Sequence, residues 1–359
     1  MLALSRVPSP LRLARLRATG LALATAAVLV ASPRASAVEV PAQAVADNTA
    51  LMVWADIASV QPQEVEESLG AVRQFLDTMK QGPMGQAMQD APLLDPLQGA
   101  QKFAEFRNEF TAAGGQAFVL VGTPDEFGEM DEPVVLIKTN GAADPAALKA
   151  AMAKLADDPS DTDDVEFEAL EPGWMIAKGD DTGELPAVGS PARANELLGL
   201  LQPQAGRPMA MVFVPTDQMR QEMNQGGQPG DPGAALGAAF SKARAMTGGL
   251  SLGANPSIKL DAAFPDAQSA QEFNTAYAGM MGQAQQGLSQ MVQMFAGQQQ
   301  PGMPPMPTAD QVNTFFGSLA LQNGGANQTL IINSGTLNSA GSMLPLFAMM
   351  MMGGGGGGF

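Results

Sequence analysis

The chain has 359 residues, of which 36 are acidic and 19 are basic, so its net charge at pH 7 is −17. It contains no histidine and no cysteine. This composition excludes the usual zinc sites, Fe–S clusters, cysteine nucleophiles and the commonest general base. A strongly acidic surface also repels phosphate backbones and anionic lipids, which disfavours binding to nucleic acids and to membrane surfaces.

The first 37 residues have the pattern of a secretory signal peptide. An arginine-rich leader precedes the apolar run 20–31, and Ala35-Ser36-Ala37 supplies the small residues that a signal peptidase needs. Because twelve apolar residues fall short of the roughly 20 that span a bilayer, cleavage after Ala37 is favoured over an uncleaved anchor. The mature chain loses five arginines and no acidic residue, so its charge becomes −22. We therefore expect a periplasmic or secreted protein.

Two apolar runs in the first part of the mature chain predict central strands, at 51–57 and 116–122. Helical spacing of apolar residues follows the first run over 63–80. A second helical region ends near Phe110, directly before the second run.

Residues 134–201 have the order strand, capped helix, two strands, capped helix. The strand is predicted at 134–139, and Asp144 and Ser190 each stand before a proline, the pattern of an N-cap followed by a favoured first helical residue. Apolar and acidic residues alternate over 165–170, which predicts a half-exposed strand. A Pro-Gly turn joins it to a second predicted strand at 174–178.

The second half repeats this order more loosely. A strand restarts at 209–214, another is predicted at 257–264, and Asp266 caps a long helix. Residues 318–322 and 329–333 are predicted to form the second hairpin.

These patterns predict an α+β fold of two tandem pseudo-repeated domains, each a largely antiparallel sheet with helices packed on one face. One continuous sheet shared by both halves is the alternative. The predicted domains are 38–205 and 206–348, the second with a Pro-rich linker at 298–307. The Met/Gly-rich tail 349–359 is predicted to be disordered.

Motifs for catalysis and calcium binding are incomplete. Residues 249–253 match the spacing of a serine nucleophile elbow, but the chain has no histidine base and a further strand follows, so a small-residue strand is predicted. The acidic run 157–168 lacks the glycine that a calcium-binding loop needs for its turn, which favours a solvated loop.

Methionine is abundant, with 24 residues against one tyrosine and two tryptophans. Thioether pairs bind Cu(I) in exported proteins, and Met303 and Met306 are candidate ligands because they lie in the linker, where no core needs them. Elsewhere methionine is expected to fill the core. Trp54 and Trp174 have the amphipathic rings that stack on sugars, but their apolar strands favour burial.

The segment AVADNTALMVWADI, which contains Ala46 to Ile57, resembles the opening strand of uncharacterised secreted bacterial proteins, many from planctomycete-type genomes. The resemblance covers about a dozen residues and contains no catalytic motif. It implies export and an α+β fold.

The function expected from the sequence is that of an exported, non-catalytic binding or scaffold protein of the cell envelope. Its partner is an unidentified protein or envelope component, with no cofactor and no transmembrane span in the mature chain. The alternatives are a Met-rich Cu(I)-binding protein and a carboxylate-based glycan hydrolase, since the separation of two carboxyl groups in space decides the latter.

Overall fold

The computed structural model describes residues 39–70, 96–124, 132–154, 164–179, 182–204, 206–225, 232–296, 307–336, 339–340 and 343. The described strands form antiparallel sheet structure and are interspersed with helices, so the α+β class is confirmed. The chain divides into two compact units, each discontinuous in sequence. Unit 1 contains the described residues of 1–62, 100–125 and 130–210, and unit 2 those of 63–99, 126–129 and 211–359.

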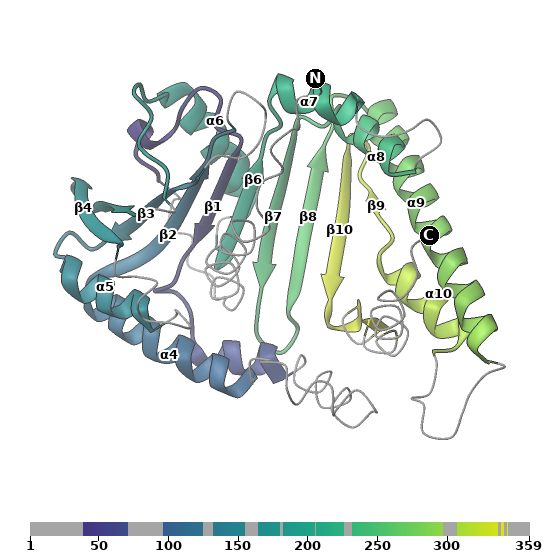
Figure 1. Cartoon of the computed structure of the whole chain (residues 1–359), viewed down its shortest axis with the longest axis horizontal. Coiled ribbons are helices and arrows are strands. Elements are labelled where there is room, and N and C mark those ends of the chain that lie inside the picture. The colour runs from purple at the N-terminus through teal and green to yellow at the C-terminus, as the bar shows by residue number, and fades with distance from the viewer. Residues whose placement is uncertain are drawn as a thin grey trace, which may run out of the picture. The chain divides into compact units, whose positions relative to one another are not determined.

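Unit 1 follows the order of elements predicted from the sequence. Its strands lie in the order β1-β2-β3-β5-β4, each antiparallel to its neighbour (Figure 1). The elements are β1 (Leu51–Ala55), α4 (Pro96–Ala112), β2 (Gly115–Gly122), β3 (Val134–Thr139), α5 (Pro145–Ala153), β4 (Glu166–Glu171), β5 (Trp174–Lys178) and α6 (Pro191–Leu201).

Both predicted helix caps in unit 1 are formed. The Asp144 carboxylate accepts hydrogen bonds from the backbone N–H groups of Ala146 and Ala147, and Ser190 Oγ accepts one from Arg193. Each cap satisfies N–H groups that the first turn of a helix leaves without a partner.

Unit 2 has strands in the order β6-β7-β8-β10-β9. Its elements are β6 (Met209–Phe213), α7 (Asp217–Gln225), α8 (Pro232–Phe240), β7 (Ala245–Ser251), β8 (Ser257–Ala263), α9 (Ala267–Ala296), α10 (Ala309–Ser318), β9 (Gln322–Asn323) and β10 (Asn327–Asn333). The predicted hairpin is wrong in its first strand, because α10 extends to Ser318 and only two residues form β9. A capping box between Thr308 and Gln311 starts this unpredicted helix.

The core of unit 1 is aromatic. Phe103, Phe106 and Phe110 of α4 are fully buried, and the Phe110 ring stacks on Phe118 of β2 with centroids 4.7 Å apart. A Cβ atom at Gly115 would lie 2.5 Å from the Phe110 ring, so this position requires glycine. The absent side chain lets the helix approach the start of β2 closely.

The N-terminal segment, residues 39–50, is hydrogen-bonded to the start of α6. Ser190 donates its backbone N–H to the Val45 carbonyl at 2.7 Å. Arg193 donates from Nε and Nη2 to the carbonyl oxygen of Thr49, at 2.9 and 2.7 Å, and Thr49 is fully buried. The guanidinium therefore satisfies a buried carbonyl that precedes β1.

The core of unit 2 forms along α9, which lies beside α8 and α10 (Figure 1). Phe273, on the N-terminal part of α9, contacts Phe240 of α8 and Phe264 after β8. Near the other end, Leu288 and Val292 pack with Val312 of α10. No helix in the described ranges is both long and apolar enough to cross a membrane.

Candidate functional site

An open pocket of about 440 Å³ lies in unit 1, where the loop from β3 to α5 meets the β4–β5 hairpin. Its volume falls within the range of about 300–1,000 Å³ typical of small ligand sites. Eleven residues line it, from Thr139 to Pro145 on one side and from Ala169 to Met175 on the other.

Backbone hydrogen bonds fix both sides of this pocket. The N–H of Thr139 donates to the carbonyl of Gly173 in the hairpin turn, at 2.8 Å. The N–H of Asp144 donates to the Ala113 carbonyl at 3.1 Å, which holds the end of the loop before α5. Gly173 has φ +81, a conformation that favours glycine. The pocket is therefore built on paired backbone.

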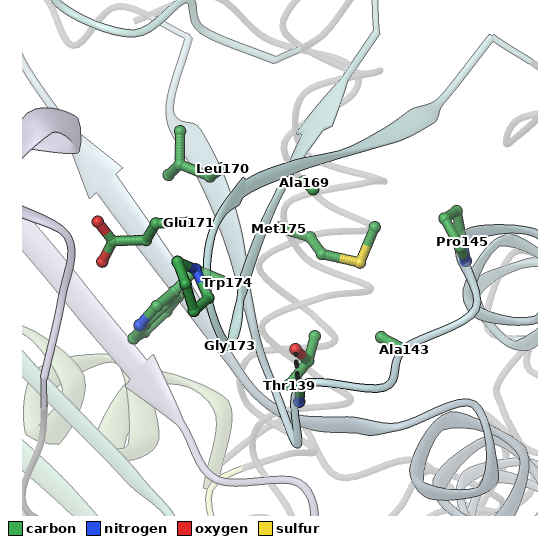
Figure 2. Close-up of a pocket in the computed structure, with 11 residues that line it drawn as sticks. Thr139, Ala143, Pro145, Ala169, Leu170, Glu171, Gly173, Trp174 and Met175 are labelled. Atoms are coloured by element: carbon green, nitrogen blue, oxygen red, sulfur yellow. Dashed lines mark hydrogen bonds between the residues drawn. The ribbon is translucent and has the colours of Figure 1, made fainter.

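The interior of the pocket is apolar. In Figure 2 the Met175 side chain extends toward Pro145 and Ala143, with Thr139 below it, whereas Trp174 and Glu171 point to the opposite side. Among the lining residues only Glu171 is ionisable. The space beside Met175 therefore suits an apolar side chain or a small apolar ligand.

Strand β4 carries a carboxylate row, formed by Glu166, Glu168 and Glu171. These residues pair with Lys178, Ile176 and Trp174 of β5, which alternate along that strand and so share one face of the sheet. An irregularity between Ala169 and Glu171 keeps the third carboxylate on this face. All three residues are exposed, and Glu168 forms an ion pair with Lys178 at 2.6 Å.

Lys138 lies between two tryptophans on the same face. Its Nζ is 5.7 Å from the ring centroid of Trp54 and 5.9 Å from that of Trp174, within the range of a cation–π interaction. It also pairs with Glu39 of the N-terminal segment at 3.9 Å. The two aromatic rings and one carboxylate thus stabilise a lysine that is only 22% exposed.

Asp56 lies after β1 and has a perturbed carboxyl group. Burial raises the pKa of Asp56 above its usual value of 3.8, against the lowering effects of hydrogen bonds from Ser59 and of the Lys138 charge. Ser59 donates its backbone N–H to Oδ1 at 3.1 Å. A buried carboxyl with a raised pKa favours its neutral form.

We expect the free energy of unfolding of the Asp56→Asn variant to rise relative to that of the wild type as pH increases. Because the folded-state pKa is raised, the wild type loses stability as pH rises from 3.8 through that pKa, while the variant has no carboxyl to ionise. Urea unfolding at a series of pH values measures the difference.

Asp266 is the matched control with the opposite sign. Ser269 donates its N–H to Asp266 at 2.7 Å and lowers its pKa, so Asp266→Asn should lose relative stability as pH rises toward 3.8. The same slope for both variants would contradict the assigned effect of burial on Asp56.

The structure tests several residues singled out from the sequence. Trp54 and Trp174 are 4% and 6% exposed, so the predicted burial is confirmed. Ser251 ends β7 and the next element is β8, as predicted for a small-residue strand. Residues outside the described ranges include Ala37, 157–163, Met303, Met306 and 349–359, so what the sequence suggests for them remains a prediction.

Sequence reasoning missed the pocket and the Lys138 cluster. The only local signal was a lysine at the end of an otherwise apolar strand. Within the described part of the chain, no group of three or more acidic residues is arranged to hold a metal ion. Comparison with protein-family models, with curated proteins and with solved structures finds no match to this chain.

Proposed function

We propose that the chain is an exported, non-catalytic binding protein of the cell envelope, and that the open pocket of unit 1 is its recognition site. The observation that carries this proposal is the apolar space between Met175 and Pro145, whose two sides are held by backbone hydrogen bonds. A rigid pocket costs little conformational entropy when a partner enters, which favours binding.

The lining favours binding over catalysis. General acid–base chemistry needs an ionisable group within hydrogen-bond reach of the substrate, and glycoside hydrolysis needs two carboxyl groups. Glu171 is the single ionisable lining residue, and its side chain points away from Met175. An apolar ligand or side chain is therefore the best match.

The proposal includes two copies of one α+β unit. Supporting it, the strands of unit 1 and unit 2 have equivalent orders, β1-β2-β3-β5-β4 and β6-β7-β8-β10-β9. We propose that helices cover one face of the sheet in each copy. We also propose that the two copies present two related binding faces. Two faces would raise the avidity for a partner with repeated epitopes.

Filling the pocket tests the binding role. Ala169 is exposed and lines the pocket, so Ala169→Trp should block entry without disturbing the core. We expect envelope proteins or glycans captured by the wild-type chain to be lost from this variant, as measured by affinity capture with quantitative mass spectrometry.

Ala150→Trp is the control, because Ala150 is exposed on α5 and does not line the pocket. Equal capture by the two variants would exclude the pocket as the recognition site. Turnover of a glycan or peptide substrate that is lost in Glu171→Gln would overturn the non-catalytic assignment.

A further inference from the structure

We propose that β4 binds an extended, cationic segment of a partner protein by strand addition. This inference rests on the proposed binding function and names the partner's chemistry. Strand β4 ends the sheet order and pairs only with β5 among the described strands (Figure 1). The N–H and C=O groups on the outer edge of such a strand form a template for another chain.

The two faces of β4 differ in chemistry. The carboxylate row lies on one face, and Phe167 and Ala169 lie on the other, paired with Ala177 and Met175. Ala169 and Met175 also line the pocket. A strand added beside β4 would therefore place every second side chain next to carboxylates and the intervening ones next to the apolar pocket.

This arrangement specifies a partner segment in which basic and small apolar residues alternate. Residues on one face of a strand repeat about every 6.6 Å, so an added strand has the same side-chain period as β4. Glu168 is already paired with Lys178, whereas Glu166 and Glu171 form no ion pair within the described part of the chain. These two carboxylates are therefore the ones available to an incoming Lys or Arg.

The carboxylate row also argues against a second copy of this chain as the occupant. Two β4 strands side by side would place carboxylates opposite one another, and like charges across strands are destabilising. The chain as a whole carries a net charge of −17, which adds to the repulsion between copies. The same residues thus reject self-association and attract a cationic strand.

The test uses a labelled, end-capped peptide of six residues that alternates lysine with valine. We expect it to bind the full chain in a fluorescence anisotropy titration, more weakly as salt increases. Hydrogen exchange should slow at the β4 amides. The double variant Glu166→Gln/Glu171→Gln should weaken binding by about two- to thirtyfold, since each of the two exposed ion pairs contributes about 0.2–1 kcal/mol.

Two controls separate strand addition from general charge attraction. The double variant Glu105→Gln/Glu222→Gln removes the same charge from exposed positions on α4 and α7, and should bind the peptide like the wild type. A peptide with all backbone nitrogens methylated keeps its charge and cannot donate to an edge strand, so it should not bind.

Equal binding of the methylated and unmethylated peptides, equal weakening by both double variants, or no binding at all would overturn strand addition. Failure of this inference is distinguishable from failure of the proposed function. If Ala169→Trp loses the envelope partner while the peptide fails its controls, the pocket stands and strand addition falls. If the peptide passes its controls while Ala169→Trp captures partners normally, strand addition stands and the pocket falls.

Discussion

Replacing Phe110 by alanine is expected to lower the free energy of unfolding by about 3–5 kcal/mol, the range for removing a buried aromatic side chain. Phe110 is fully buried. Its ring centroid lies 5.3 Å from that of Phe106, and the ring also packs on Phe118. The ring also fills the space above Gly115. Neighbouring side chains cannot easily close such a cavity, because the surrounding rings are fixed in contact with one another.

Urea unfolding followed by tryptophan fluorescence measures this loss, since both tryptophans lie in strands of unit 1. Phe167→Ala is the matched control, because Phe167 is a half-buried residue of the edge strand β4. We expect it to cost about 1 kcal/mol. A loss for Phe110→Ala no larger than this would show that the aromatic cluster does not form the core.

Replacing Arg193 by alanine is expected to lower the free energy of unfolding by about 2–3 kcal/mol. The change removes two charge-assisted hydrogen bonds to the Thr49 carbonyl and leaves this buried acceptor without its guanidinium. The Arg193 side chain is only 13% exposed, so water does not readily replace the lost donors.

Two further variants isolate the contact with Thr49. Arg193→Lys keeps the charge but lacks the planar fork, so it should recover only part of the stability. Glu196→Gln removes the exposed ion pair of Arg193 and should cost less than about 1 kcal/mol. Equal losses for Arg193→Ala and Glu196→Gln in urea unfolding would show that the bonds to Thr49 contribute nothing.

Local chemistry was enough to predict the elements of unit 1. The apolar run at 134–139 predicted β3, and the Asp144-Pro145 and Ser190-Pro191 pairs predicted the starts of α5 and α6. In unit 2 the same reasoning failed at α10, although Thr308 and Gln311 have the spacing of a capping box. The proline-rich stretch directly before Thr308 is typical of an extended linker, and it separates this helix start from any preceding periodic pattern.

The candidate site depends on pairings that no local pattern contains. Trp54, Lys138 and Trp174 come from three strands, and their register brings them to one face only once the sheet forms. The irregularity at Leu170 moves Glu171 onto the face of Glu166, against simple alternation along the strand. Predicting either feature requires strand register, which short-range periodicity does not specify.

The bond between Arg193 and Thr49 joins residues 144 positions apart. A ribosome delivers the N-terminal segment first, and at about 5–20 residues per second the guanidinium follows about 7–30 s later. Within unit 2, Ser68 and Gly253 meet across 185 residues. Such distant pairings must overcome loop-closure entropy before they stabilise anything, which slows folding. Residues 39–50 therefore gain their last contacts only after α6 has been added to the chain, and until then their bonds to residues 122–124 at the end of β2 are the ones they can form.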